Sequence, residues 1–271
     1  MRLAAQPQQL NMTDTFDYRG KVVLVTGGTK GIGRTFAESF LKAGATVVIC
    51  GRNAPETLPC HDNNNAEFLS LDVRDVDAVN DLFAKIVERH GRLDVVVNNA
   101  GGAPPTDAAT ASPRFHESII RLNLIAPLHI AQKANTIMQQ QDSGGVIVFI
   151  GSIAAHRPSP GVAAYSAAKA GIVHLVKTLA FEWAPKVRTV SISPGLVRTE
   201  ETDRLYSGDE AGVAAVNATI PMGRMANPED IANACLFVAS PLAQYVSGVD
   251  LLIHGGGEKP AFLEAWGAEK G

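Results

Sequence analysis

Seven apolar, strand-like runs alternate along this chain with helix-like segments, and no other feature restricts the possible fold as strongly. The runs cover residues 21–27, 45–50, 67–73, 92–101, 144–152, 187–195 and 248–256. Between them lie predicted helices at about 31–43, 75–90, 113–140, 162–184 and 228–239. Continuously apolar strands belong to a sheet that is covered on both faces. The alternation predicts parallel strands joined by right-handed crossovers.

The sequence therefore predicts an α/β fold, with a single-domain, doubly wound, Rossmann-like sheet of seven parallel strands and helices on both faces. We assign residues 20–257 to a dinucleotide-binding and catalytic domain. Residues 1–19 and 258–271 are assigned to flexible N-terminal and C-terminal tails. Ligands of such folds bind at the carboxyl ends of the strands.

Two connections interrupt the alternation. The link at 51–66 contains Pro55, Pro59 and three consecutive asparagines, so its crossover helix is expected to be short or absent. Residues from about 200 to 226 lack a clear period. We interpret that stretch as a mobile substrate lid, with an ordinary surface connection as the alternative.

Composition argues against several classes of protein. The net charge of −3 gives no basic footprint for nucleic acid. No apolar run reaches the roughly 18 residues of a membrane span, and the N-terminus lacks a signal-peptide core. The three cysteines, Cys50, Cys60 and Cys235, have no metal-like spacing. We expect a cytoplasmic protein with reduced thiols and no metal site.

The stretch TGGTKGIG at 26–33 joins the first strand to the first helix. Its glycines permit a tight turn and a close approach of phosphate to the backbone. The following helix offers N–H groups and a positive dipole end to a diphosphate. The spacing differs from the commoner GxGxxG, but its place after the first strand favours a dinucleotide site. The predicted contacts are Gly27, Thr29, Lys30, Gly31, Ile32 and Gly33.

The end of the second strand bears on the choice of cofactor. Dinucleotide folds often place an acid there for the ribose 2′-hydroxyl of NAD, whereas this chain has Arg52. Arg52, together with Lys30, can bind a 2′-phosphate through charge-assisted hydrogen bonds. We therefore favour NADP(H), with NAD(H) possible and a solvated Arg52 as the alternative. Asp72, with Val73 beside it at the third strand end, is expected to contact adenine.

Tyr165 and Lys169 lie one helical turn apart in the sequence YSAAK. A phenol has a pKa near 10, which is too high for easy proton transfer at neutral pH. We expect the Lys169 ammonium to lower the pKa of Tyr165 into the range of a general acid or base. Ser152, at the end of the fifth strand, can hydrogen-bond a substrate carbonyl. A Tyr–Lys pair alone is weak evidence, because such pairs often only cover a helix surface.

Taken together, these motifs resemble the short-chain dehydrogenase/reductase family. The match includes TGGTKGIG, NNAG at 98–101, Asn123, Ser152, YSAAK and PGLVRT at 194–199, in order over about 20–256. The resemblance implies that Tyr165 transfers the proton and that Lys169 binds the nicotinamide ribose and depresses the tyrosine pKa. It also implies that Ser152 orients the carbonyl and that the Asn123 main chain holds a relay water. The remaining implied cofactor contacts are Asn99, Ala100, Gly101, Pro194, Gly195, Val197 and Thr199.

One of these roles has a physical argument of its own. Pro127 follows Asn123 by four residues and has no N–H to donate to the Asn123 carbonyl. That carbonyl is then free to accept a water proton, although a packing kink without chemistry is an equal alternative.

The predicted helix at 162–184 is small or apolar almost all round, which favours burial against a second subunit. We expect a homo-oligomer, a dimer or a tetramer. The predicted function is hydride transfer between NADP(H) and a carbonyl or secondary alcohol. A catalytically silent dinucleotide sensor or scaffold, and an isomerase or lyase on the same fold, are the alternatives. A largely apolar small-molecule substrate is indicated by Gly102, Ala103, Pro104, Ile153, Val162, Leu196 and Leu205.

Overall fold

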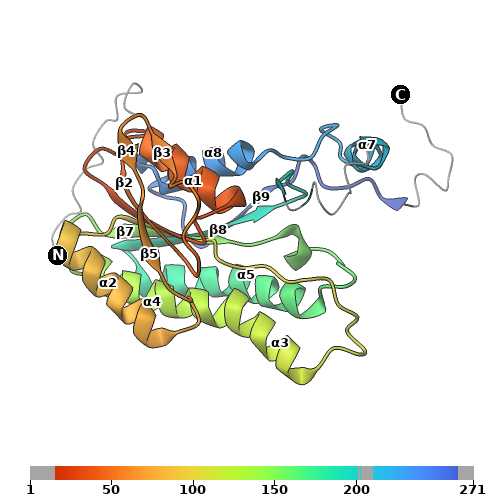
Figure 1. Cartoon of the computed structure of the whole chain (residues 1–271), viewed down its shortest axis with the longest axis horizontal. Helices are drawn as coiled ribbons and strands as arrows, with labels where there is room; N and C mark the ends of the chain where they lie inside the picture. The colour runs from red at the N-terminus through yellow and green to blue at the C-terminus, as the bar shows by residue number, and fades with distance from the viewer. Residues whose placement is uncertain (1–15, 201, 203–209, 262–271) are drawn as a thin grey trace.

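A seven-stranded parallel sheet forms the centre of the computed structural model, which describes residues 16–200, 202 and 210–261 (Figure 1). The strand order is β5-β2-β1-β6-β7-β8-β9, and each neighbouring pair is parallel. The order reverses beside β1, where ligands of doubly wound folds bind. The strands are β1 (Val22–Thr26), β2 (Thr46–Gly51), β5 (Glu67–Ser70), β6 (Val95–Asn98), β7 (Gly145–Ile150), β8 (Val187–Pro194) and β9 (Asp250–Ile253).

Helices cover both faces of this sheet, as predicted (Figure 1). α1 (Gly31–Lys42) and α8 (Pro228–Ala239) pack on one face, in a core that includes Phe36 and Phe40. The other face carries α2 (Val76–His90), α4 (Ala126–Met138) and α5 (Ala163–Trp183), packed around a second apolar cluster. Two separate cores explain why the strands are apolar along their whole length.

The long helix predicted at 113–140 is divided by a π-helical turn. α3 (Pro113–Ile120) continues into the π turn Arg121–Ile125 and then into α4. The Ala126 N–H donates to the Arg121 carbonyl five residues back. Pro127, which has no N–H, follows directly. Proline and the wider turn thus shift the hydrogen-bond pattern around Asn123.

The link between β2 and β5 contains no helix, which confirms the expectation for residues 51–66. It contains instead an antiparallel hairpin of β3 (Cys60–His61) and β4 (Asn64–Asn65). Arg34 of α1 donates to the Thr57 carbonyl at 2.7 Å and so holds the link on the helix. The hairpin was not predicted, because its strands are short and polar.

The predicted lid is partly described. α7 (Glu210–Thr219) lies within it, and the Met225 N–H donates to Asn217 Oδ1 at 2.8 Å. Residues 201 and 203–209, among them Leu205 of the expected substrate lining, lie outside the described residues. The mobility of the lid remains a prediction. No helix in the described part of the chain is long and apolar enough to cross a bilayer.

The packed domain extends beyond the predicted boundaries of 20 and 257. Tyr18 is buried, donates its hydroxyl to the Leu236 carbonyl at 2.6 Å and packs edge-on against Phe40. At the other end, Glu258 pairs with Arg157 at 2.6 Å. The Lys259 N–H donates to the carbonyl of Thr219, in the predicted lid, at 2.8 Å. In both assigned tails, the residues next to the domain therefore pack against it.

Candidate active site

The glycine-rich turn lies at the carboxyl end of β1 and leads into α1. Gly27 and Gly31 have φ values of +65° and +54°, which glycine adopts without strain. A Cβ atom on Gly33 would lie 2.2 Å from the Gly27 carbonyl oxygen, so only glycine fits there. The first turn of α1 carries no acidic residue, and the Lys30 side chain does not cap it. This helix N-terminus is therefore suited to an anion.

The end of β6 is attached to this turn by hydrogen bonds. Asn99 Nδ2 donates to the carbonyls of Thr26 and Gly27 at 3.0 and 3.2 Å. The Thr26 hydroxyl in turn accepts from the N–H groups of Asn99 and Ala100, both at 3.0 Å. The structure thus brings together the glycine turn and the 99–101 segment, which lie about seventy residues apart in the chain.

The ends of β2 and β5 form the positively charged side of the site. Arg52 is exposed directly after β2, and the Thr29 methyl lies 3.2 Å from the position of a Cβ on Gly51. Asp72, which we expected to contact adenine, is paired with Arg74 at 2.6 Å. Hydrogen bonds from Arg74 lower the pKa of Asp72 to about 2. Arg74 was not among the predicted site residues, although its position two residues after Asp72 was an available signal.

Lys169 is the most deeply buried charge of the site. Its Nζ donates to the Ile150 carbonyl at 2.7 Å and lies 5.4 Å from the ring centre of Tyr165. Only 4% of Lys169 is exposed, and this burial lowers its pKa from 10.5 to about 8. The ammonium is thus held beside the phenol, one turn further along α5.

The pKa of Tyr165 does not shift in the direction that we predicted. Burial raises it above the ordinary value of 10, and a hydrogen bond with Ser152 opposes the rise. Desolvation outweighs this hydrogen bond, because the phenolate would lose more hydration than its neighbours replace. At neutral pH the phenol therefore carries its proton.

Ser152 and Asn123 complete the predicted set. Ser152 caps a 3₁₀ turn, η3 (Ile153–Ala155), with its hydroxyl accepting from the Ala154 N–H at 3.1 Å. Asn123 is fully buried, and its side chain accepts from the Gly102 N–H at 2.8 Å. A Cβ on Gly101 would meet Asn123 Oδ1 at 2.7 Å and Lys169 Nζ at 3.4 Å. Asn123, Gly101 and Lys169 are thus immediate neighbours.

The segment 194–199 leaves the end of β8 toward the lid. The Gly195 N–H donates to the Ile253 carbonyl at 2.9 Å, and a Cβ there would lie 2.8 Å from the His254 backbone. Val197 forms a β-bridge with Ala226 across the base of the lid. Ile32 and Val73, also predicted contacts, follow the ends of β1 and β5. The predicted site residues are therefore distributed along one edge of the sheet.

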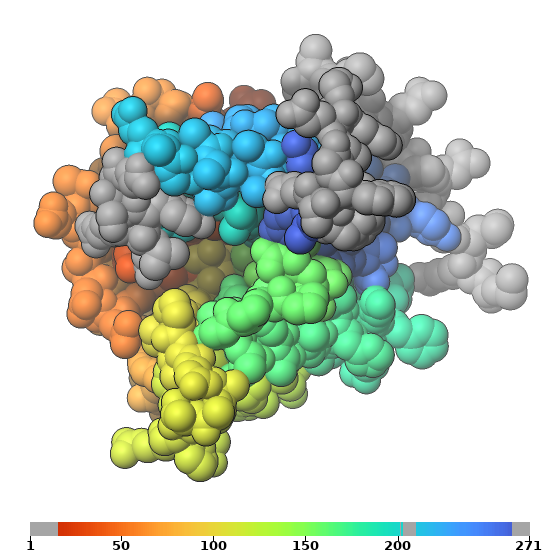
Figure 2. Space-filling model, turned by 90° about the vertical axis from the view of Figure 1, so that its right-hand side faces the viewer, coloured from red at the N-terminus to blue at the C-terminus, as the bar shows by residue number. Residues whose placement is uncertain are grey.

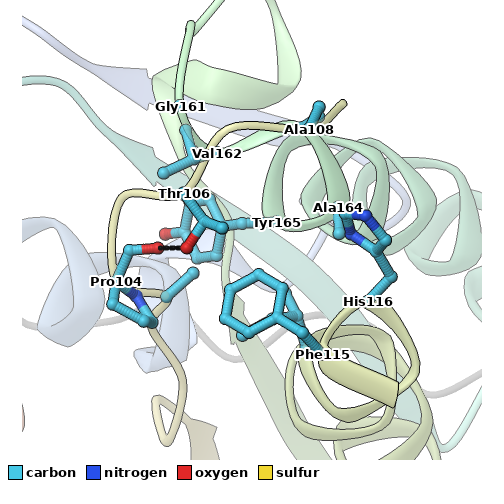
Figure 3. Close-up of a pocket in the computed structure, with 12 residues that line it drawn as sticks. Pro104, Thr106, Ala108, Phe115, His116, Gly161, Val162, Ala164 and Tyr165 are labelled. Carbon is cyan, nitrogen blue, oxygen red and sulfur yellow. Dashed lines mark hydrogen bonds between the residues drawn. The ribbon is translucent and has the colours of Figure 1, made fainter. Parts of the chain in front are cut away.

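That edge is hollowed in Figure 2, where the yellow and green loops lie below and the cyan segment that includes α7 lies above. A pocket with an empty volume of about 230 Å³ opens beside Tyr165 (Figure 3). Phe115 and His116 contribute to it from α3. Its full lining is Ala103, Pro104, Thr106, Ala108, Phe115, His116, Ile119, Gly161, Val162, Ala163, Ala164 and Tyr165.

This lining agrees only in part with the expected one. Ala103, Pro104 and Val162 line the pocket, whereas Gly102, Ile153 and Leu196 do not. Phe115 and His116 were not among the predicted lining residues. Ser112, whose hydroxyl caps α3, and Pro113 mark the start of this helix, so the sequence did indicate that both rings lie in its first turn.

Comparisons with known proteins agree with this geometry. The family model described as "Enoyl-(Acyl carrier protein) reductase" matches residues 27–258. An uncharacterized short-chain type dehydrogenase/reductase, y4vI of Sinorhizobium fredii, is 34% identical over 242 residues, which are 88% of this chain and 43% of that longer protein. The 3-oxoacyl-[acyl-carrier-protein] reductase FabG of Escherichia coli is 32% identical, covering 89% of this chain and 98% of FabG.

A solved structure has the same fold. It is a 7α-hydroxysteroid dehydrogenase complexed with NADH and 7-oxo glycochenodeoxycholic acid. It superposes with a TM-score of 0.81 at 30% identity, over 92% of this chain and 98% of that one.

Replacement of Lys169 by methionine should stabilise the protein. At neutral pH the folded state holds a desolvated ammonium whose pKa is about 8, compared with 10.5 when unfolded. The replacement removes the free-energy cost of burying this ammonium, so the free energy of unfolding rises by up to about 3 kcal/mol. The stability difference between the variant and the wild type shrinks as the pH rises from 8 to 10.5. In that range Lys169 loses its proton in the folded wild type, and the wild-type protein becomes more stable.

Urea unfolding at neutral pH and at about pH 10 measures this effect. Lys177→Met, on an exposed position of the same helix, serves as the control and should change stability little at either pH. A destabilised Lys169→Met at neutral pH would contradict the prediction.

Proposed function

The chain belongs to the short-chain dehydrogenase/reductase family, and we propose that it transfers a hydride between NADP(H) and a carbonyl or secondary-alcohol substrate. The observation that carries the proposal is the arrangement of Tyr165 with Ser152 and Lys169 beside a pocket and a glycine turn. FabG is named as a 3-oxoacyl-[acyl-carrier-protein] reductase, and the superposed dehydrogenase is complexed with NADH and 7-oxo glycochenodeoxycholic acid.

The residues present fit a dinucleotide. The diphosphate would bind at the N-terminus of α1, where a Cβ on Gly31 would meet no atom within 4 Å, so the backbone there is open to a ligand. Residues 99–101 would border the adenosine ribose, and 194–199 would hold the carboxamide. NADP is favoured because Arg52 is exposed at the end of β2, whereas the nearby acid Asp72 is paired with Arg74. When bound, such a cofactor supplies or accepts the hydride.

Tyr165 is the proposed proton donor. Its raised pKa keeps the phenol protonated at neutral pH, which suits donation to a carbonyl oxygen in the direction of reduction. Ser152 would orient that oxygen with its hydroxyl. Lys169 would bind ribose hydroxyls and supply positive charge when a phenolate forms. The Asn123 carbonyl receives no hydrogen bond from Pro127 and is proposed to hold a relay water.

The substrate is proposed to present an apolar group to the pocket beside Tyr165. Phe115, Ile119 and Val162 offer apolar surface there, while Thr106 and His116 are the polar side chains. Apolar surface with few polar groups is typical of pockets for small organic molecules. A panel of aliphatic, alicyclic and aromatic ketones tests this class.

Replacement of Tyr165 by phenylalanine should lower the rate of ketone reduction by at least about a hundredfold, because the proton donor is lost. Cofactor affinity should stay within a few-fold of the wild type, since the ring remains. The absorbance of reduced nicotinamide gives the rate, and fluorescence titration gives the affinity. A wild type that binds cofactor but reduces no ketone in the panel would support the sensor, isomerase or lyase alternatives instead.

Arg52→Ala should weaken NADPH binding about tenfold and leave NADH binding unchanged, because a charge-assisted hydrogen bond to the 2′-phosphate is removed. Titration of both reduced cofactors measures the change. Lys42→Ala is the matched control, since it removes an exposed cation at the opposite end of α1. Equal losses for NADPH and NADH would refute the role of Arg52.

The protein is proposed to be a homo-oligomer. Phe181 on α5 is 90% exposed, and Tyr245 is fully exposed. Phe237, Leu242, Val249 and Leu252 are further exposed large apolar side chains. Apolar surface of this kind favours association where it is contiguous. Light scattering should give a native mass that is a multiple of 28.6 kDa. A monomer at micromolar concentration would exclude a stable assembly.

A further inference from the structure

A buried polar cluster lies beyond the groups that the proposed mechanism uses. It consists of Ser191, Ser193, Asp250 and His156. Asp250 Oδ1 accepts from Ser191 Oγ at 2.5 Å and from Ser193 Oγ at 2.9 Å. Asp250 Oδ2 lies 2.8 Å from His156 Nε2. One carboxylate therefore joins β8, β9 and the loop that follows Ser152.

The burial of the cluster makes these contacts important for the local structure. Ser191 and Ser193 are fully buried, and the Asp250 side chain is only 8% exposed. The alternate β8 residues, Val190 and Ile192, point into the apolar core under α8. Buried hydroxyl groups and carboxylates without partners destabilise a fold, so Ser191, Ser193 and Asp250 depend on one another. His156 approaches Asp250 Oδ2 from a partly exposed position.

The cluster reaches Ser152 from two directions. The 3₁₀ turn η3 carries Ser152 at its N-terminal end and His156 at its C-terminal end. The contact of His156 with Asp250 therefore fixes the far end of the turn that Ser152 caps. On the near side, a Cβ on Gly151 would lie 2.3 Å from Ser193 Oγ. The backbone just before Ser152 thus rests on a hydroxyl whose orientation Asp250 sets.

We propose that Asp250 is a positioning residue for Ser152, acting through Ser193 and His156. The inference rests on the proposed function, in which the Ser152 hydroxyl orients the substrate carbonyl. Small displacements of such a group lower the rate of the chemical step with little change in cofactor binding. The cluster accounts for the otherwise unexplained burial of a carboxylate and two serines behind the site.

A double-mutant cycle tests the proposal. With the ketone that the wild type reduces fastest, Asp250→Ala should lower kcat about tenfold or more, with KM and NADPH affinity within about threefold. Added to Ser152→Ala, the same replacement should cause no further loss, because its effect passes through Ser152. Asp250→Asn keeps the size of the side chain and an acceptor oxygen for Ser191 and Ser193, and it should restore most of the lost kcat.

Two further variants keep the test decisive. His156→Ala changes a partly exposed side chain and should lower kcat by a smaller factor; it decides the matter if Asp250→Ala does not fold. Glu258→Gln is the matched control, since it weakens the neighbouring Arg157 ion pair of the same loop without touching the cluster. Three outcomes would each overturn the proposal. One is an unchanged kcat in a folded Asp250→Ala or His156→Ala variant. The others are losses that add to those of Ser152→Ala, and an equal loss in Glu258→Gln.

A second readout is independent of turnover. Hydrogen exchange of the amides at 153–157 should accelerate about tenfold or more in Asp250→Ala, whereas the amides of α8 should exchange as in the wild type. Unchanged exchange at 153–157 would overturn the positioning role. If the wild type reduces no ketone, the proposed function fails, and this measurement still reports on the cluster.

Discussion

Parallel alignment of the seven strands is the constraint on which the rest of this structure depends. Because all strands run in one direction, their carboxyl ends meet at one edge, and the predicted site residues after six of these strand ends lie along it. The glycine turn after β1 and the 99–101 segment after β6 are then joined by hydrogen bonds, and Ser152 follows the end of β7 at the same edge. The sheet supplies the geometry, and the loops supply the chemistry.

The buried charge at Lys169 shows how stability is balanced against activity at this edge. Its ammonium is removed from water, keeps a hydrogen bond to the Ile150 carbonyl and lies beside the Tyr165 ring. A side chain that is costly to bury persists where its charge has a use, which fits a site for a sugar hydroxyl and a developing phenolate. The raised pKa of Tyr165 and the lowered pKa of Lys169 have the same cause, the low hydration of this crevice.

Periodicity and composition predicted the sheet, its layers and the missing crossover helix, because burial on two faces leaves a direct mark on the sequence. The motifs likewise placed the site residues at one edge. Two features depended on contacts between distant segments and left no local signal. Tyr18 binds the Leu236 carbonyl, and His156 meets Asp250 from a loop almost a hundred residues away. The pKa of Tyr165 shifted against expectation because pairwise charge reasoning omits desolvation.

The hairpin that replaces a crossover helix has a practical consequence. Cys60 begins β3 and is exposed, whereas Cys50 and Cys235 are buried and burial raises the pKa of both thiols. Thiolates, not thiols, react with maleimides and similar reagents. The native chain therefore carries a selective attachment point for a fluorophore. Cys60 belongs to neither apolar core and does not line the pocket. The hairpin lies at the amino-terminal edge of the sheet, where Asn64 Nδ2 donates to the Ala45 carbonyl at 3.1 Å. A reporter attached to Cys60 would therefore lie away from the proposed nucleotide site and would need no engineered cysteine.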